Sequence, residues 1–283
     1  MPLDSTFLKT AYEYFDPYTP SSGTEHISIL LYSMARMTRP RVVVEYGSGH
    51  STLYILRALA DNANDFEEEK ASLIVKTQEL LESGFMQGGV VQPSASDEIG
   101  KWFAAGGKAC AVNPSFYLKP YEPHLYSFEQ QENDHPYVQQ MQSAISDIGH
   151  DDIFTHLTGQ EYKANAIPIG DQYIDWAWND LNDYQQFFVE FWPRINPDGG
   201  LLIFHNTVSV RIQYDAIQWM KKNRAESGED DLEILFIEEP HKLNQNGCTI
   251  LRKTSKYSPT FHLANQEKIL GDLLQFAQEE NII

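Results

Sequence analysis

Acidic or imidazole side chains follow predicted buried strands at four places in the chain. These residues are Glu45, Glu129, Asp180 and His205. A carboxylate at a strand end can accept hydrogen bonds from the hydroxyls of a ribose. An imidazole with a pKa near about 6.5 can take a proton from a hydroxyl group. The residue types therefore indicate a nucleoside-like ligand and a reaction that moves a proton.

The first of these acids belongs to a strand–turn–helix segment. Val42–Val44 is an uninterrupted β-branched run, which predicts a short strand buried on both faces. Gly47 and Gly49 form a turn, and helical spacing of apolar residues follows to about Ala60. The glycines let the backbone approach a ligand, and the N–H groups at the helix start receive polar groups. A tight turn that binds nothing is the alternative interpretation.

The turn resembles motif I of the class I S-adenosylmethionine (SAM) dependent methyltransferases, in which an acid and one spacer precede Gly-x-Gly-x-Gly. Glu45, Gly47 and Gly49 fill the first three marked places. A dinucleotide-binding turn needs its third Gly at position 52, where this chain has Thr52. The resemblance implies that the amino-acid end of SAM is held by Glu45, Gly47, Ser48, Gly49, Ser51 and Thr52.

The same resemblance assigns the other cofactor contacts. It places the SAM ribose on Glu129 and the adenine beside Gln130. Gly159 and Gln160 stand where family members carry a short adenine-contacting loop. Asp180 ends a stretch similar to motif IV, so the resemblance implies that it faces the methyl-donor end of the cofactor.

His205 and Asn206 follow a predicted strand at 201–204 whose preceding turn also resembles the family. Many cation-dependent O-methyltransferases have Asp-Asn here as magnesium ligands. Because magnesium prefers carboxylate oxygen, we expect no resident metal and expect His205 to act as a general base. Asp180 would either orient the imidazole or bind the substrate. A softer divalent metal on Asp180, His205 and Asn206 is a less favoured alternative. A strand-end histidine with a satisfied hydrogen bond is another.

Two residues are predicted to bind the substrate. Asn206 lies beside the predicted base, and His26 lies in the first turn of a helix that precedes motif I. In the family this helix often lines the cofactor pocket. A solvent-facing histidine at position 26 is the alternative.

Composition excludes several function classes. The chain has 283 residues, 42% hydrophobic content and a formal net charge of −19. An acidic chain lacks the basic stripe that nucleic acid requires, and it is repelled by anionic membranes. Cys110 and Cys248 lack metal-ligand spacing, which suits a reducing cytoplasm. No apolar stretch is long enough to span a bilayer, and the N-terminus lacks signal-peptide features.

The order of elements predicts an α/β fold with a doubly wound, mostly parallel seven-stranded sheet and an antiparallel last strand, a Rossmann-like methyltransferase fold. We expect an N-terminal helical segment at 1–40, a SAM-binding domain at 41–253 and a C-terminal helical tail at 254–283. An insertion at 61–122, with a separate helix at 66–81, is predicted to be a lid or a substrate-recognition element. An oligomer contact is the open alternative. The apolar face of the tail must be buried against its own domain or a partner subunit.

These patterns together predict a SAM-dependent methyltransferase that acts on a small molecule, at a hydroxyl oxygen, with S-adenosylhomocysteine (SAH) as the product. Two other classes stay open: an NAD-linked oxidoreductase that uses the same turn, and a non-catalytic SAM-binding protein. We expect a cytoplasmic protein, with a homodimer as one possible assembly.

Overall fold

The computed structural model describes residues 3–19, 23–87, 90–91, 95–104, 106–109, 111–159, 163–229, 231–259 and 266–283. Gln160 and Cys110 lie outside these ranges. The chain divides into two compact units. The first is Met1–Asp61 with Pro123–Ser258, and the second is Asn62–Glu122 with Pro259–Ile283.

The first unit contains a seven-stranded sheet with the order β5-β4-β1-β6-β7-β9-β8. Its strands are β1 (Val42–Tyr46), β4 (His124–Glu129), β5 (Phe154–Thr158), β6 (Trp176–Asn179), β7 (Leu201–His205), β8 (Leu232–Ile237) and β9 (Cys248–Lys253). Strands β5, β4, β1, β6 and β7 pair in parallel, and β9 is antiparallel to both β7 and β8. The predicted doubly wound, mostly parallel sheet with an antiparallel last strand is confirmed.

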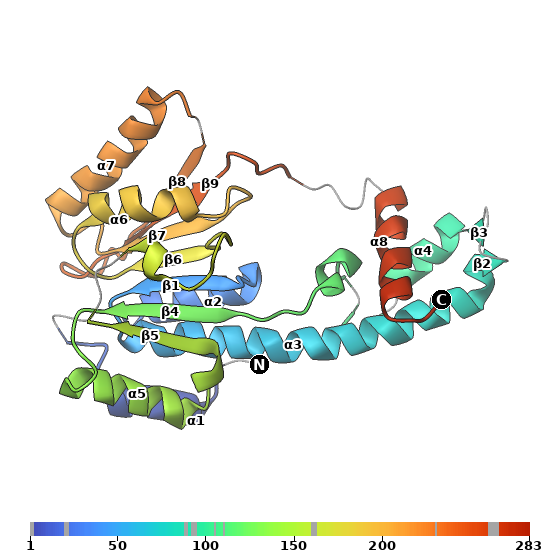
Figure 1. Cartoon of the computed structure of the whole chain (residues 1–283), viewed down its shortest axis with the longest axis horizontal. Helices are drawn as coiled ribbons and strands as arrows, with labels where there is room; N and C mark the ends of the chain where they lie inside the picture. The colour runs from blue at the N-terminus through green and yellow to red at the C-terminus, as the bar shows by residue number, and fades with distance from the viewer. Residues whose placement is uncertain are drawn as a thin grey trace. The chain divides into compact units, whose positions relative to one another are not determined.

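Helices cover both faces of this sheet (Figure 1). They are α1 (Ser5–Tyr14), α2 (Ile27–Thr38), the start of α3 (His50–Leu80), α5 (Pro136–Ile148), α6 (Tyr184–Phe191) and α7 (Arg211–Glu226). The first four pack on one hydrophobic cluster and the last two on another. Val43 joins the first cluster, whereas Val42 and Val44 join the second, because successive side chains of a strand point to opposite faces. All three valines are buried, as the uninterrupted run predicted.

Helix α3 differs from the sequence-based expectation. The pattern predicted one helix that ends near Ala60 and a second at 66–81, but the structure has a single helix, His50–Leu80. The intervening residues include neither Gly nor Pro, so nothing in the backbone stops the helix. Among the described helices, none combines the length and apolar character that a bilayer crossing requires.

The second unit joins the insertion to the C-terminal tail. It contains the rest of α3, η1 (Leu81–Phe85), β2 (Met86–Gln87), β3 (Val90–Val91), α4 (Ala95–Ala104), η2 (Pro114–Leu118) and α8 (Gln266–Glu279). Phe66 stacks on Tyr117 with ring centroids 5.0 Å apart, and Leu273 and Phe276 of α8 are buried in the same cluster. The apolar face of the tail is therefore buried against the insertion of its own chain.

Candidate functional site

The carboxyl ends of β1, β4, β6 and β7 meet at one edge of the sheet. In the strand register, Tyr46 pairs with both Phe128 and Asn179, and Asn179 pairs with Phe204. Residues that directly follow these positions must therefore lie close together. This register explains why the predicted acids and the histidine, distant in sequence, gather at one place.

A cavity of about 390 Å³ opens at this edge, within the size range of roughly 300–1,000 Å³ of small-molecule sites. Its described lining residues come from the N-terminal segment, the motif I turn, the ends of β4 and β6 and the start of α5. They are Tyr14, Phe15, Asp16, Thr19, Thr24, Gly47, Ser48, Gly49, His50, Glu129, Tyr137, Asp180 and Leu181. These residues include three carboxylates and neither a lysine nor an arginine. The cavity therefore favours a cationic ligand.

The glycine turn gives this cavity its close backbone wall. Gly47 has a φ of +96°, and a Cβ there would lie 3.0 Å from the side chain of Leu181. A Cβ on Gly49 would lie 3.3 Å from the hydroxyl of Tyr137. That hydroxyl donates a hydrogen bond of 2.5 Å to the carbonyl of Ser48. Neighbouring side chains thus leave little room for a Cβ at either position, so both positions favour glycine. This requirement agrees with the motif I interpretation of the turn.

Glu129 lies at the end of β4 and faces the cavity, where the resemblance placed it. The hydroxyl of Ser48 donates to its Oε2 at 3.2 Å, and the backbone N–H of Gln131 donates to its Oε1 at 3.1 Å. Each carboxylate oxygen thus has one donor, and the two bonds together fix the orientation of the carboxylate. It can still accept hydrogen bonds from a ligand in the cavity.

Glu45 lies behind the cavity wall and is fully buried. Its carboxyl accepts hydrogen bonds from the hydroxyls of Ser51, Thr52 and Ser127, at 2.8, 2.6 and 2.9 Å. Burial nevertheless raises the pKa of Glu45 to about 7. Thr52 also accepts a hydrogen bond from the N–H of Gly49 at 2.8 Å. The structure thus places Glu45, Ser51 and Thr52 where they shape the turn rather than line the cavity.

Asp180 and His205 form a pair at the ends of β6 and β7. The Nδ1 of His205 lies 2.5 Å from Oδ1 of Asp180. His205 is only 1% exposed and does not line the cavity, whereas Asp180 does. Among the described residues, the Nε2 atom of His205 is buried with no hydrogen-bond partner. A ligand in the cavity therefore meets Asp180 first, with the imidazole behind it.

The other predicted site residues lie away from the cavity lining. Asn206 adopts a φ of +56° and accepts a hydrogen bond from the hydroxyl of Ser209. Gln130 is exposed, and the N–H of Gly159 donates to the carbonyl of Glu129 at 3.0 Å. His26 instead contacts Glu239, with its Nδ1 2.8 Å from Oε1 of that residue.

Several lining residues were missed by sequence reasoning. Tyr14, Asp16 and Thr24 come from the N-terminal segment, and Tyr137 comes from the start of α5. His50 directly follows the motif I turn, so its place in the chain was the one available signal. Burial lowers the pKa of His50 to about 4, which keeps this imidazole neutral at the cavity wall.

A second cavity, of about 510 Å³, lies at the starts of α6 and α7. It is lined by Asn182, Asp183, Tyr184, Gln185, Gln186, Ile212, Gln213 and Ala216. It contains none of the predicted site residues. Because the predicted contacts gather at the first cavity, that cavity is the candidate active site.

Comparisons with known proteins define the class of fold. No family model matches the sequence, and no curated protein matches it. Among solved structures, the chain is similar to the O-methyltransferase TomG of Streptomyces achromogenes, involved in tomaymycin synthesis and solved with SAM. Sequence identity is 14%, coverage is 89% of this chain and 91% of TomG, and the TM-score is 0.51. It is also similar to an O-methyltransferase of Bacillus cereus in complex with SAH, at 12% identity, 90% and 93% coverage and a TM-score of 0.52.

These likenesses confirm the predicted Rossmann-like methyltransferase fold. The chain shares it with O-methyltransferases over about nine-tenths of both lengths, 89% and 91% for TomG.

Proposed function

We propose that the protein is a SAM-dependent methyltransferase that methylates a hydroxyl oxygen of a small molecule and releases SAH. The observation that carries this proposal is the charge of the candidate cavity. Asp16, Glu129 and Asp180 line it, without a lysine or arginine among the described lining residues. SAM carries a sulfonium and an ammonium group, so three carboxylates attract it. The binding of SAM and SAH by the two similar O-methyltransferases supports the same ligand.

The cofactor contacts follow from this geometry. Glu129 is oriented to accept the ribose hydroxyls, and the backbone at Gly47, Ser48 and Gly49 approaches the ligand closely. Glu45 acts indirectly, because it holds Ser51 and Thr52 and so fixes the turn. This assignment changes the role of Glu45 from a ligand contact to a positioning residue.

The proposed reaction needs alignment and one proton acceptor. When bound, SAM would supply an activated methyl group to the acceptor oxygen, and the electron pair of the broken carbon–sulfur bond would stay on the sulfur of SAH. The hydroxyl proton passes to the Asp180–His205 pair, in which Asp180 faces the ligand. The imidazole then stabilises the protonated pair through its Nδ1 contact with Oδ1. The cavity walls hold the two reacting groups in line and exclude water.

The other function classes differ from the proposed one either in the ligand bound or in turnover. NAD carries a negatively charged pyrophosphate, which the three cavity carboxylates would repel, so an NAD-linked oxidoreductase is the weaker candidate. A non-catalytic SAM-binding protein would bind the cofactor without turnover. The role of 61–122 as a lid or substrate-recognition element, a cytoplasmic location and a homodimer stay predictions.

Calorimetric titration of the full chain tests the proposal directly. We expect SAM and SAH to bind with micromolar or tighter affinity, and NAD to show no binding at the same concentrations. Mass spectrometry of reactions with a panel of hydroxyl-bearing metabolites then tests for a gain of one methyl group and for SAH. Binding of NAD in preference to SAM would refute the proposed class.

A further inference from the structure

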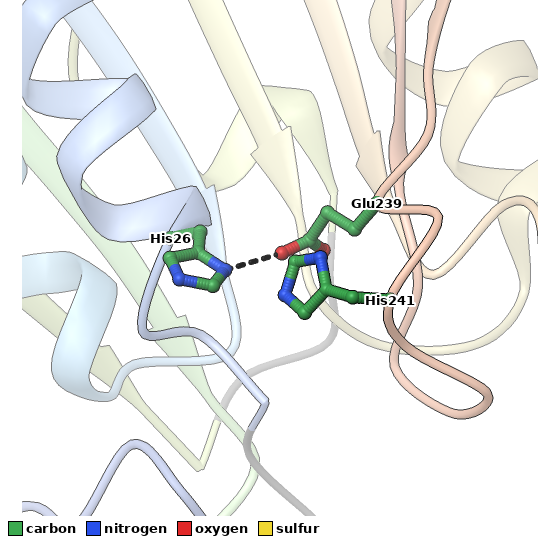
Figure 2. A group of neighbouring side chains, drawn as sticks. All are labelled: His26, Glu239 and His241. Atoms are coloured by element: carbon green, nitrogen blue, oxygen red, sulfur yellow. Dashed lines mark hydrogen bonds and ion pairs between the residues drawn. The ribbon is translucent and has the colours of Figure 1, made fainter.

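A group of three metal-ligand side chains lies outside the residues that line the candidate cavity. His26 precedes helix α2, while Glu239 and His241 belong to the connection between β8 and β9. One ligand atom of each residue lies within 4.8 Å of the others. Figure 2 shows both imidazole rings directed toward the carboxylate of Glu239. The Nδ1 of His26 lies 2.8 Å from Oε1 of Glu239, and the two ring centroids lie 5.1 Å apart.

The carboxylate at the centre of this group is anchored. Glu239 is 8% exposed, and its backbone N–H donates to Oδ1 of Asn246 at 2.8 Å. The N–H of Gly247 donates to Oε2 of Glu239 at 3.3 Å. These bonds hold Oε2 on the protein side and leave Oε1 toward the histidines. The side chain of His26 is 54% exposed and His241 is exposed, so solvent has access to the group.

The surrounding charge permits a divalent cation. Lys242 is the cation next to Glu239, with its Nζ 3.4 Å from Oε2. The same Nζ lies 3.1 Å from Oε1 of Glu25, so one ammonium group is shared by two carboxylates. The two histidines are neutral when deprotonated. The net local charge is therefore negative. Lys242 contacts Oε2 of Glu239, whereas Oε1 of Glu239 contacts His26.

We propose that His26, Glu239 and His241 form a binding site for a zinc-class divalent transition-metal ion. Two imidazole nitrogens and one carboxylate oxygen are a common zinc donor set, with the fourth position open to water. Ligand atoms at about 2.0–2.2 Å from zinc in a tetrahedral arrangement are about 3.3 Å apart. To bind zinc, the 2.8 Å distance between His26 Nδ1 and Glu239 Oε1 must lengthen slightly. Ligand atoms that lie up to 4.8 Å apart must move closer together. Both histidine side chains are exposed, so they have room to rotate toward these separations.

A metal at this position would connect two segments near the candidate cavity. Thr24 lines that cavity, and it lies two residues before His26. Lys242 already donates a hydrogen bond of 2.8 Å to the carbonyl of Gly23. Lys242 also pairs with Glu25, and His26 contacts Glu239, so the 23–26 segment and the β8–β9 connection are already joined by polar contacts. The ion would reinforce this junction. We therefore assign it a structural role in fixing one wall of the cavity, independent of the methyl-transfer proposal.

Metal titration of the chelator-treated full chain tests this site. We expect one Zn²⁺ to bind with micromolar or tighter affinity at about pH 7.5, and Co²⁺ to give the strong visible absorption of a tetrahedral site. His241→Gln and Glu239→Gln should each weaken Zn²⁺ binding at least tenfold.

His135→Asn is the matched control. It removes another exposed imidazole while retaining a side chain that can cap α5, as His135 does through its contact with the N–H of Tyr137. We expect wild-type Zn²⁺ affinity in this variant. Thermal unfolding without metal confirms that each variant is folded, and His241→Gln should fold normally because its side chain is exposed. Absence of Zn²⁺ binding, or binding that survives both site substitutions, would overturn the proposal.

Discussion

The Nδ1 of His205 lies 2.5 Å from Oδ1 of Asp180, and of these two residues only Asp180 lines the candidate cavity. The pair thus has an outer and an inner member. The strand register produces this order, because β6 and β7 are adjacent and parallel and end side by side. A base function for the pair requires Asp180 at the ligand and His205 behind it.

The first prediction concerns Asp180. Asp180→Asn removes the cavity-facing carboxylate while preserving the size of the side chain. We expect kcat to fall by roughly 100-fold or more, the usual contribution of a general base. Asp183→Asn is the control, because Asp183 makes no side-chain cap contact and its φ of +61° suits Asn. Full turnover in Asp180→Asn would show that this carboxylate takes no part in proton transfer.

His205 should affect turnover without affecting cofactor affinity. His205→Gln removes the imidazole from the buried position behind Asp180, so the protonated pair loses its stabilisation. We expect kcat to fall about tenfold and the pH dependence of kcat to shift, while the SAM dissociation constant stays within a few-fold. A proportional loss of SAM binding would instead indicate a structural role for His205.

Glu129 should control cofactor affinity. Glu129→Gln removes the charge that accepts the ribose hydroxyls, so SAM and SAH affinity should fall about tenfold, or about 1.4 kcal/mol. The exposed neighbour Glu132 provides the control through Glu132→Gln. Calorimetry that gives equal affinities for wild type and Glu129→Gln would remove Glu129 from the site.

The motif I turn should not tolerate a side chain at Gly47. Gly47→Ala places a Cβ at a φ of +96° and 3.0 Å from Leu181, which should lower the free energy of unfolding by about 1–3 kcal/mol. It should also weaken SAM binding, because the turn forms the cavity wall. Gly271→Ala in α8 meets no atom within 4 Å and should be neutral or slightly stabilising. Chemical denaturation of both variants checks this difference, and equal stability would contradict it.

The sequence predicted the sheet and the strand-end acids because both depend on local signals. The β-branched run Val42–Val44 predicts a buried parallel strand. In a doubly wound sheet, ligands bind at the carboxyl ends of such strands. The direction of a side chain at that edge is not local. Glu45 turns inward because hydroxyls of Ser51, Thr52 and Ser127 are available to it. The spacing of residues in the sequence does not predict this inward direction of the Glu45 side chain.

Apart from His50, whose position directly after the motif I turn is a local signal, the missed features depend on distant packing. Tyr14 and Asp16 reach the cavity wall from the N-terminal segment, and their own sequence pattern indicates only a short aromatic helix and a turn. His26 was predicted to bind substrate, but its imidazole binds Glu239, which lies over two hundred positions later in the chain (|i−j| = 213). Such a partner depends on where the β8–β9 connection folds, and the local sequence around His26 does not contain that information.

The last prediction uses two buried groups with opposite pH dependence. Burial raises the pKa of Glu45 from its ordinary 4.5 to about 7, so the folded state binds the proton more tightly than the unfolded state. Its contribution to stability is full below about pH 4.5 and is lost as pH rises to about 7, on the order of 3 kcal/mol in total. Burial lowers the pKa of His50 from 6.5 to about 4. Its contribution is full above about pH 6.5 and is lost as pH falls to about 4.

Between about pH 4.5 and 6.5, Glu45 makes the unfolding free energy decrease with rising pH, whereas His50 makes it increase. Removing one group should therefore reveal the pH dependence that the other contributes. In Glu45→Gln, the unfolding free energy should fall more steeply than in wild type as pH decreases through this range. In His50→Gln, it should fall more steeply than in wild type as pH increases from about 4.5 to about 7. Denaturant unfolding at several pH values measures both differences. If Glu45→Gln has the same pH profile as wild type, Glu45 is ionised throughout, and its three hydroxyl partners outweigh its burial.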